Sequence, residues 1–400
     1  MCFNILTMGI RQAIICILIS LTGIGCSSED NPSTEPAQYP QITTPQNTQP
    51  ERFVSLTGGV TTVGIKENGT LWAWGKNVSG QMGNGQTADY FYSFLPSQIG
   101  TDTNWKTVEY SGSSVIGIKT DGSLWRWGTV FNLETNHNEF IASPTRIGND
   151  SDWKMVVGTS GYYVGIKENG TLWGWGYDSN IGLGRTESYH LNPTLLNDGN
   201  WKEVAGGANH SIALKADGTI WTMGNNNEGE LGNGMLNVST YTLSQVGTAA
   251  DWSHVYAGTA SCLAIKTNGT LWAWGRNTYG QLGLGSISQT LAPTQVGNAS
   301  DWRMASISGS DTIFLKNDGT VWGCGLFMKK LVGTALNSVT ETYSPVKLDN
   351  RTDWDGVLAI AGTVYARKSN FDYWGVGYSY ALGLSTSDFF NLQMTPMAWN

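Results

Sequence analysis

Residue types that carry out chemistry are few in this 400-residue sequence, and they are spread along the chain. A metal site, or a general acid and base, would need histidines, cysteines or carboxylates that converge on one point. No two histidines have the spacing of metal ligands, and no Gly-x-Ser-x-Gly motif follows an expected strand to present a nucleophilic serine. The four histidines are His137, His190, His210 and His254.

Acidic residues recur instead at fixed positions of a sequence repeat. Asp121, Asp217 and Asp318 each precede a glycine, where we expect them to form turns. A second acidic set stands in expected loops, just before a tryptophan: Asp152, Asp251, Asp301 and Asp353. A residue that every copy requires serves the fold, so none of these acids is assigned a catalytic role. We therefore predict that the protein is not an enzyme and that it uses no cofactor and no metal.

Cys26 carries a specific chemical expectation, the acylation of its thiol. Residues 1–25 contain one Arg, then an apolar stretch, then small residues just before Cys26, which is typical of a secretory signal peptide. The Gly-Ile-Gly before the cysteine resembles a bacterial lipobox, except that Gly23 stands where Leu is usual. We expect a lipid on Cys26, and the alternative is simple signal cleavage nearby.

Residues 26–51 are predicted to be a disordered polar tether, because they are rich in Pro, Thr, Ser and Gln and have no apolar periodicity. The Ser-Ser-Glu-Asp after Cys26 resembles the acidic tag of surface-exported lipoproteins of some bacteria. The N-terminus thus predicts an exported protein that is lipid-anchored at the bacterial outer membrane or cell surface.

Composition restricts the class of partner. The net charge is −8, and removal of the signal peptide with its single Arg would make it −9. An acidic chain without a basic run is a poor ligand for a phosphate backbone, so no nucleic acid is expected. Cys262 and Cys324 stand at non-equivalent positions of the repeat, which favours two buried free thiols over a disulfide.

The remaining chain, residues 52–400, is built from a sequence repeat. The decapeptide KENGTLWAWG at residues 66–75 returns as KENGTLWGWG at residues 167–176, and five more copies complete the set. The first Trp of the copies falls at positions 72, 125, 173, 221, 272, 322 and 374, so the period is 48 to 53 residues. A period of this length is typical of a solenoid, a propeller or an array.

Each copy predicts four short antiparallel strands. An Asn-Gly or Asp-Gly dipeptide between apolar runs predicts a hairpin with a type I′ turn. A further strand begins at a second Trp, and another begins at or near a Pro such as Pro96 or Pro144. No 3.6-residue periodicity occurs beyond the N-terminus, which excludes a helical solenoid. We predict an all-β fold, a seven-bladed β-propeller with four antiparallel strands per blade, in which residues 53–57 and 393–399 meet at one seam.

The fourth copy, VAGGANHSIALKADGTIWTMGNNNEGELGNG, resembles the repeat of the regulator of chromosome condensation family. The resemblance rests on Gly-Gly-x-x-His-Ser, the hairpin, and Gly-x-Leu-Gly-x-Gly, whose pattern recurs from Gly80, Gly229 and Gly280. The family's eukaryotic namesake is a nuclear exchange factor for a small GTPase that also docks on chromatin. Against that role, the regular spacing leaves no room for an extra wedge hairpin, and the family histidine is present only as His210.

Function is expected where the copies differ, which is mainly in the loops between the third and fourth strands. Aromatic residues gather there and predict a rim that binds a partner. The alternative is that half of them pack under neighbouring blades as local core. The candidate partner-binding residues are Tyr90, Phe91, Tyr92, Phe94, Phe131, Phe140, Tyr189, Phe389 and Phe390.

The main hypothesis is an extracytoplasmic scaffold, a surface or envelope lipoprotein whose propeller rim binds an envelope or extracellular protein. The alternative is a carbohydrate-binding propeller, in which aromatic faces stack on sugars and several weak sites add by avidity. Guanine-nucleotide exchange, by family analogy, is a third and less favoured hypothesis.

Overall fold

The computed structural model describes residues 52–87, 92–132, 137–159, 161–177, 189–326, 343–360, 363–378, 382 and 390–396. The expected signal peptide and tether, with Cys26, lie outside these residues, and so do Tyr90, Phe91 and Phe389. Within the described ranges, no helix has both the length and the apolar character that a membrane span requires.

The described strands form seven sheets, each of four consecutive antiparallel strands. This confirms the prediction of an all-β, seven-bladed propeller, and the sheets are called blades one to seven in chain order. Blades one and two comprise β1 (Phe53–Gly58), β2 (Thr61–Lys66), β3 (Leu71–Lys76), β4 (Tyr92–Ile99), β5 (Trp105–Ser111), β6 (Ser114–Lys119), β7 (Leu124–Asn132) and β8 (His137–Ile147).

The other five blades repeat this order. Blades three and four comprise β9 (Trp153–Thr159), β10 (Tyr162–Lys167), β11 (Leu172–Tyr177), β12 (Tyr189–Asn197), β13 (Trp201–Gly206), β14 (His210–Lys215), β15 (Ile220–Gly224) and β16 (Thr240–Gln245). Blades five to seven comprise β17 (Trp252–Ala257), β18 (Ser261–Lys266), β19 (Leu271–Gly275), β20 (Thr290–Gln295), β21 (Trp302–Ile307), β22 (Asp311–Lys316), β23 (Val321–Gly325), β24 (Val346–Lys347), β25 (Trp354–Ile360), β26 (Thr363–Lys368), β27 (Tyr373–Tyr378) and β28 (Phe390–Pro396).

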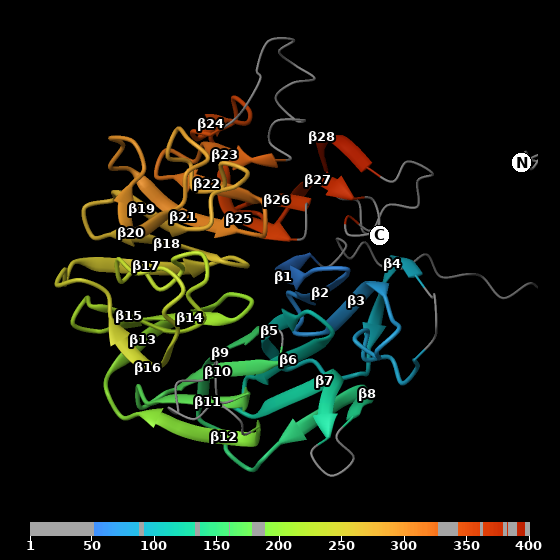
Figure 1. Ribbon diagram of the computed structural model, residues 1–400. Helices are drawn as coiled ribbons and strands as arrows, with labels where there is room; N and C mark the ends of the chain where they lie inside the picture. The colour runs from blue at the N-terminus through green and yellow to red at the C-terminus, as the bar shows by residue number, and fades with distance from the viewer. Residues whose placement is uncertain are drawn as a thin grey trace, which may run out of the picture. The chain divides into compact units, whose positions relative to one another are not determined.

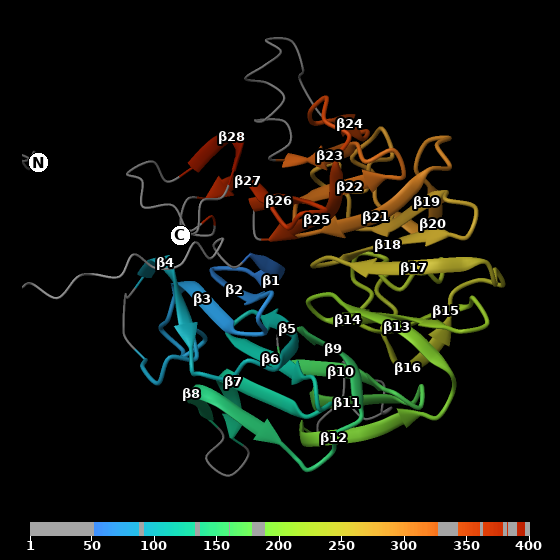
Figure 2. The same cartoon turned by 180° about the vertical axis from the view of Figure 1, so that it is seen from behind.

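The first strand of each blade faces the centre of the ring and the fourth lies outermost (Figure 1). Both views place β1 beside blade seven (Figure 2), where Arg367 Nη1 donates to the carbonyl of Val54 at 2.9 Å. Blades seven and one therefore close the ring by packing, without sharing a strand. The predicted seam is correct for the blades but wrong for the strands, because β1 is innermost and β28 is outermost.

The hairpin turn between the second and third strands differs from the expected type I′. In blade one, the amide of Gly69 donates to the carbonyl of Lys66 at 2.9 Å, and Gly69 has a φ of +75°. Asn68 has negative φ, since the described non-glycine residues with positive φ are Asn237 and Phe371. This is a type I turn followed by a glycine bulge, so the type I′ prediction is wrong while the need for glycine stands.

The turn glycine also contacts the next blade. A Cβ atom at Gly69 would lie 2.1 Å from the carbonyl oxygen of Thr103. The carbonyl of Gly69 accepts a 3.1 Å hydrogen bond from the amide of Trp105, the residue that opens β5. The turns of blades one to six are each docked in this way on the start of the following blade, which is why glycine recurs there with its period.

The Asn or Asp of the turn anchors the first Trp of the repeat through an intermediate hydroxyl. Asn68 Oδ1 accepts hydrogen bonds from the amide and hydroxyl of Thr70, at 3.0 and 2.6 Å. Thr70 Oγ1 in turn accepts from Trp72 Nε1 at 2.8 Å. The same relay is built from Asp121, Asn169, Asp217, Asn268 and Asp318, so the structure assigns these residues to the turns.

A lysine at the end of the second strand of each blade lies over aromatic rings of the same blade. Lys119 Nζ lies 3.7 Å from the ring centroid of Trp125 and 4.9 Å from that of Trp105, and it bonds Asp102 at 2.7 Å. A cation over an indole contributes about 0.5 to 1 kcal/mol at exposed sites and about 2 kcal/mol when it is desolvated, as at Lys119, which is 6% exposed. Acids that the sequence placed in loops pair with such lysines: Asp152, Asp251, Asp301 and Asp353.

The hydrophobic core is divided into seven clusters, one at each boundary between neighbouring blades. At the boundary of blades two and three, for example, Ile116 and Leu124 pack against Trp153 and Trp175. Because each sheet is apolar on the faces that meet its neighbours, no blade can bury its surface alone. The ring, rather than the blade, is the unit that folds.

A loop after the third strand closes the boundary with the next blade, and we call its three described copies the plug loops: residues 77–85, 226–234 and 277–285. In the first, Asn77 Oδ1 accepts from the amide of Met82 at 3.0 Å. Met82 and its counterparts Leu231 and Leu282 are 0 to 1% exposed. Each plug loop thus seals a crevice with one apolar side chain.

Candidate functional site

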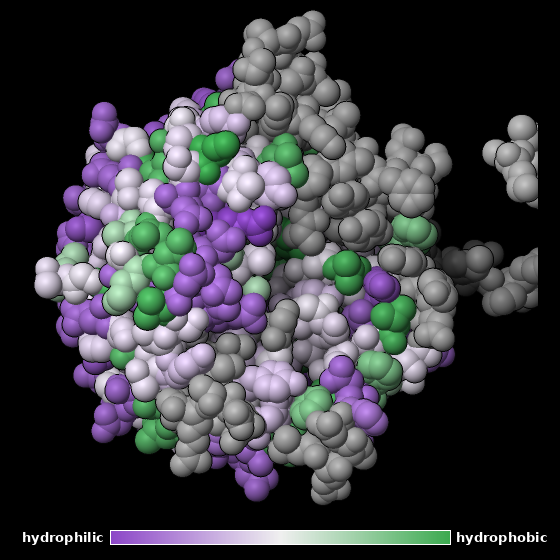
Figure 3. Space-filling model, viewed as in Figure 1, coloured by the Kyte–Doolittle hydropathy of each residue, from purple (hydrophilic) through white to green (hydrophobic). Residues whose placement is uncertain are grey.

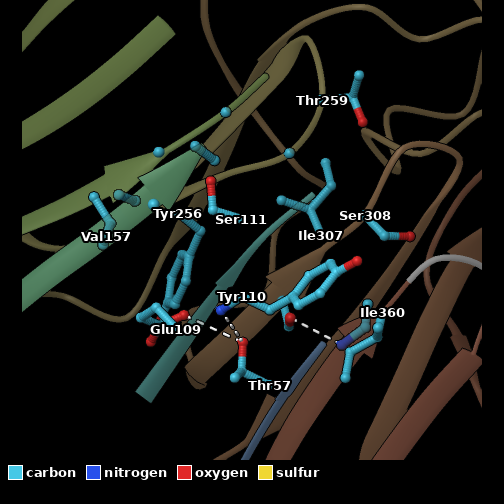
Figure 4. Close-up of a pocket in the computed structure, with 18 of the residues that line it drawn as sticks. Thr57, Glu109, Tyr110, Ser111, Val157, Tyr256, Thr259, Ile307, Ser308 and Ile360 are labelled. Atoms are coloured by element: carbon cyan, nitrogen blue, oxygen red, sulfur yellow. Dashed lines mark hydrogen bonds between the residues drawn. The ribbon is translucent and has the colours of Figure 1, made fainter. Parts of the chain in front are cut away.

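The innermost strands of all seven blades enclose a central channel with a volume of about 570 Å³ (Figure 4). Most of its described lining consists of glycine and small or apolar side chains. Glu109 is the only carboxylate among these lining residues. Catalysis needs several titratable groups that converge on one reacting atom, and the described lining of the channel brings no such set together.

The polar groups of the channel tie neighbouring strands together. Thr57 Oγ1 donates to Glu109 at 3.3 Å and accepts from the amide of Tyr110 at 3.2 Å, as Figure 4 shows. Ser306 Oγ accepts from the amide of Ala359 at 2.9 Å. Removal of the Glu109 carboxyl from bulk water raises its pKa to about 7, and the hydrogen bond from Thr57 opposes that rise.

A second pocket of about 260 Å³ lies at the boundary of blades two and three, and we call it the aromatic crevice. Its lining includes Ser114, Phe131 and Asn138 of blade two. Blade three contributes Tyr163, Tyr177 and Tyr189 to the same lining. Aromatic faces, hydroxyls and one amide therefore converge on a space large enough for a peptide segment or a sugar ring.

Three aromatic side chains of the crevice contact one another. The ring centroid of Phe131 lies 5.9 Å from that of Tyr177 and 5.3 Å from that of Tyr189. Tyr177 and Tyr189 meet edge to face at 5.0 Å. Tyr177 is 42% exposed, so the cluster presents part of its aromatic surface to solvent. Such a surface provides large contact area at a low entropy cost.

The inner wall of the crevice is formed by Tyr163, whose ring stacks on Trp175 at 5.3 Å with an interplanar angle of 19°. Its hydroxyl and Ser114 Oγ share a 2.6 Å hydrogen bond. Burial raises the pKa of Tyr163, and it raises the pKa of Tyr189 to about 12. The positive charge of Arg126 opposes the rise at both tyrosines. Arg126 lies across the strand pair from Ile116, a member of the apolar cluster between blades two and three.

The structure brings two of the predicted rim residues together, Phe131 and Tyr189, both in the crevice. Phe94 and Phe140 are exposed, at 42% and 54%, on outermost strands of blades one and two. Tyr92 and Phe390 begin β4 and β28. Three predicted members lie outside the described residues: Tyr90, Phe91 and Phe389. The rim as one binding surface therefore stays a prediction, of which the structure brings Phe131 and Tyr189 into one pocket.

Sequence reasoning missed Tyr163, Tyr177, Trp175 and Arg126. A signal for Arg126 was present, because the motif Trp-x-Trp-Gly contains Arg in blade two and Ala or Gly in blades one, three and five. Tyr163 and Tyr177 lie on repeated strands, whereas partner-binding residues were expected in the variable loops. Only the meeting of two blades shows that they share one cavity.

His210, the family histidine, is fully buried and is not a surface group. Its Nε2 lies 3.2 Å from Cys262 Sγ, and burial lowers the pKa of the imidazole to about 4. The carbonyl oxygen of His210 accepts a hydrogen bond from the hydroxyl of Tyr162 at 2.5 Å. Cys262 and Cys324 are free and buried, which confirms that prediction, and burial raises the pKa of both thiols.

The repeated turn acids are held in their charged form. Hydrogen bonds from the hydroxyl and amide of the next-but-one residue lower the pKa of Asp121, Asp217 and Asp318. In the described part of the chain, no three His, Cys, Asp or Glu residues lie together as metal ligands would.

The surface seen in Figure 3 is mostly hydrophilic, with hydrophobic residues in several small, separate patches. Exposed large apolar residues on blade four and on the loop before β20 include Met235, Val238, Tyr241 and Ile287. Scattered apolar residues are normal on a soluble protein, whereas a lined cavity with convergent polar groups is a stronger indication of binding. The aromatic crevice is therefore the better candidate.

Family comparison agrees with the repeat. A family model of the regulator of chromosome condensation (RCC1) repeat matches residues 68–117, 169–214 and 268–315. A second model of the same repeat matches residues 201–230 and 252–281.

Solved structures share the fold. Prp20p from Saccharomyces cerevisiae, in a study of its binding to Gsp1p and histones, is 17% identical with a TM-score of 0.71 over 86% of this chain and 87% of that chain. Yeast RCC1 (Prp20) bound to Kap60 is 16% identical, with a TM-score of 0.72 over 91% of each chain. Human WBSCR16 is 17% identical, with a TM-score of 0.69 over 82% of this chain and 94% of that chain. The TM-scores show that these proteins share the fold of this chain, and the low sequence identities carry no conclusion beyond the fold.

Proposed function

The chain carries regulator of chromosome condensation repeats on a seven-bladed propeller, and we propose that it is an exported, non-enzymatic scaffold whose aromatic rim binds a protein partner. The partner surface is centred on the aromatic crevice and extends to the exposed Phe94 and Phe140. Cys26 anchors the protein by a lipid at the outer membrane or cell surface, and residues 27–51 tether the propeller to it.

One observation carries the proposal: Phe131, Tyr177 and Tyr189 converge on a pocket at a blade boundary and leave aromatic surface exposed. A packed core would bury these rings, as it buries Trp127 and Trp274 with 0% exposure. Aromatic residues are enriched among those that dominate protein–protein binding energy. The rest of the repeat is occupied with turns, lysine contacts and blade packing.

Proteins of the same fold offer a consistent precedent. Prp20p is described with Gsp1p and histones, and Kap60 is bound to the same yeast protein. We therefore favour a protein as the partner here. Guanine-nucleotide exchange, which family analogy also suggests, finds no supporting residue in the part of the chain that the structure describes.

Co-purification from the envelope of the source cells tests the proposal. The tagged full chain is compared with a Phe94→Ser, Phe140→Ser double variant and with a Tyr241→Ser control, which removes an exposed ring from blade four. Both substituted positions of the double variant are exposed, so its melting temperature should match that of the parent. A protein that is retained by the parent and by the control but lost by the double variant supports the proposal. Equal retention by all three contradicts it.

Carbohydrate binding is the second candidate, because hydroxyls and one amide accompany the aromatic rings of the crevice. Ser114 and Asn138 are placed to meet sugar hydroxyls while Tyr177 offers a face for stacking. A glycan array with the same variants separates the candidates. A glycan signal that depends on Tyr177, without any protein retained from the envelope, would favour the sugar.

A further inference from the structure

The plug loops supply a hydrogen-bond acceptor to the blade that follows them. The carbonyl oxygen of Gln81 accepts from Trp127 Nε1 at 3.0 Å, and that of Glu230 accepts from Trp274 Nε1 at 3.0 Å. Gln281, in the third plug loop, accepts from Thr312 Oγ1 at 2.6 Å. At each of these boundaries, a buried donor of one blade is satisfied by a loop of the preceding blade.

Blade two departs from this pattern. Its third and fourth strands are extended, as β7 (Leu124–Asn132) and β8 (His137–Ile147), and its sequence has no Gly-x-Leu-Gly there. The matching donor on blade three is Trp175, which is 1% exposed. Among the residues that the structure describes, Trp175 Nε1 has no hydrogen-bond partner. The aromatic crevice lies at this boundary, and Tyr163 of its lining stacks on Trp175.

Other indole nitrogens without a partner occupy a different repeat position. Trp105, Trp252 and Trp302 open the first strands of their blades, and their Nε1 atoms also have no described partner. At the position of Trp175, by contrast, Trp127 and Trp274 are both satisfied by plug loops. The unsatisfied Nε1 of Trp175 therefore coincides with the lack of a plug-loop sequence in blade two.

The cation beside the crevice is a second unpaired group. Arg126 replaces the buried alanine that blades one and five carry as Ala73 and Ala273. It is half-buried, and no ion pair or hydrogen bond joins its guanidinium to another described residue. A buried or half-buried arginine is normally paired with a carboxylate, because its charge is costly to leave uncompensated.

We propose that the aromatic crevice binds a short acidic loop of a protein partner, which takes the place of the plug loop that blade two lacks. Tyr163, which stacks on Trp175, turns aside so that a backbone carbonyl of the loop accepts from the buried Trp175 Nε1, as Gln81 and Glu230 do in the intact boundaries. An Asp or Glu of the loop pairs with Arg126, and a neighbouring apolar side chain packs on Phe131 and Tyr177. This inference rests on the proposed function and names the chemistry of the partner at its site.

Tyr163 and Arg126 explain why the bound loop should be acidic rather than a copy of the plug. At the first boundary, Met82 packs in one cluster with Ala73 and Val115. Arg126 and Tyr163 stand at the positions of these two residues, so a plug leucine or methionine has less room. A carboxylate is smaller and is attracted by the guanidinium, which gives a charge-assisted hydrogen bond about twice as strong as a neutral one.

Two blocked peptides test the proposal on the full chain. The first is acetyl-Gly-Gln-Leu-Gly-Leu-Gly-amide, the sequence of residues 280–285, and the second replaces its first Leu by Glu. The readout is the indole ¹H–¹⁵N resonance of Trp175 in protein labelled at tryptophan, which is assigned with Trp175→Phe. We expect the Glu peptide to shift this resonance downfield and to bind about tenfold more tightly than the Leu peptide.

The variants are Arg126→Ala and, as a charge-matched control, Arg146→Ala. Arg126→Ala gives blade two the Trp-Ala-Trp-Gly strand of blades one and five, so it should fold, and its melting temperature checks that. We expect Arg126→Ala to remove the preference for the Glu peptide. Arg146, an exposed residue whose guanidinium donates to backbone carbonyls, should be replaceable without effect.

An unchanged Trp175 resonance overturns the proposal, and so does a shift that is equal for the two peptides or is insensitive to Arg126→Ala. A shift caused by a panel of neutral oligosaccharides, but not by the Glu peptide, overturns it in favour of a sugar. If the peptides fail while the Phe94→Ser, Phe140→Ser variant still loses an envelope protein, the acidic-loop inference falls and the proposed function stands.

Discussion

The indole nitrogen of Trp274 donates a 3.0 Å hydrogen bond to the carbonyl oxygen of Glu230, across the boundary between blades five and four. The equivalent donor on blade three, Trp175, has no partner among the described residues. The two tryptophans are alike in burial, at 0% and 1% exposure. They therefore form a natural pair that isolates what the plug loop contributes.

Replacing Trp274 by Phe should lower the free energy of unfolding more than replacing Trp175 by Phe. Both changes remove similar indole volume from a packed boundary. Only the first leaves a buried carbonyl without its indole donor, so the difference should be about 1 kcal/mol. Urea unfolding of the two variants measures it, and equal losses would show that the plug-loop hydrogen bond contributes nothing.

Gly218→Ala should destabilise the protein more than Gly234→Ala. Both glycines have positive φ, +83° and +80°, so both substitutions carry strain of about 1 to 3 kcal/mol. A Cβ atom at Gly218 would also lie 2.2 Å from the carbonyl oxygen of Ala250, whereas a Cβ atom at Gly234 meets nothing within 4 Å. Thermal melts of the two variants compare them, and identical melting temperatures would mean that the turn is not docked on blade five.

Stability should depend on pH through the half-buried Glu109 and the buried His210, which have opposite effects. The pKa of Glu109 is raised from 4.5 to about 7, so its contribution is present below pH 4.5 and is lost as the pH rises through 7. The pKa of His210 is lowered from 6.5 to about 4, so its contribution is present above pH 6.5 and is lost as the pH falls through 4. As the pH rises, Glu109 therefore lowers the free energy of unfolding of the parent protein while His210 raises it.

Glu109→Gln should leave the pH dependence of the free energy of unfolding that His210 causes. We expect the free energy of unfolding of this variant to rise with pH between 4 and 6.5, and to exceed that of the parent above pH 7 by at most about 3 kcal/mol. Denaturant unfolding at several pH values gives both curves. A difference between variant and parent that stays constant with pH would show that Glu109 is not desolvated in the channel.

Cys26→Ser should release the protein from the membrane fraction. The lipid on Cys26 is a prediction from its position after a signal sequence, and the polar residues 27–51 offer no apolar anchor of their own. Detergent partitioning and the mass of the mature N-terminus check it. Equal partitioning of Cys26→Ser and the parent, or an unmodified Cys26 in the parent, would leave only simple signal cleavage.

The period of the tryptophans was sufficient to predict the blades, because each copy carries the same turn, strands and apolar faces. The turn type was predicted wrongly, since Asn-Gly and Asp-Gly are compatible both with type I′ and with a type I turn plus glycine bulge. The negative φ of Asn68 decides for the second, and Asn68 Oδ1 accepts hydrogen bonds from the amide and hydroxyl of Thr70. Likewise, the sequence gave no sign that the acid before four of the Trp strands, such as Asp152, pairs with a lysine of the same blade.

The candidate site was predictable only in part. Phe131 and Tyr189 stood out because they lie in variable loops, but their contact with Tyr177 depends on how two blades meet. Arg126 could have been noticed, because it is a charged residue where the other copies of the Trp-x-Trp-Gly motif have Ala or Gly. The unpaired nitrogen of Trp175 could not, because it results from a loop that the preceding blade does not have.

Site-specific photocrosslinking in the source cells tests the central claim most directly. A photoreactive phenylalanine is placed at Phe140, whose cross-strand partner is Thr129 of the crevice lining, and in a control at Tyr241, which is exposed on blade four. The account predicts a discrete crosslinked protein from position 140 and none from position 241, with the product lost on Arg126→Ala. Crosslinks from position 241 alone, or the same products from both positions, would contradict it.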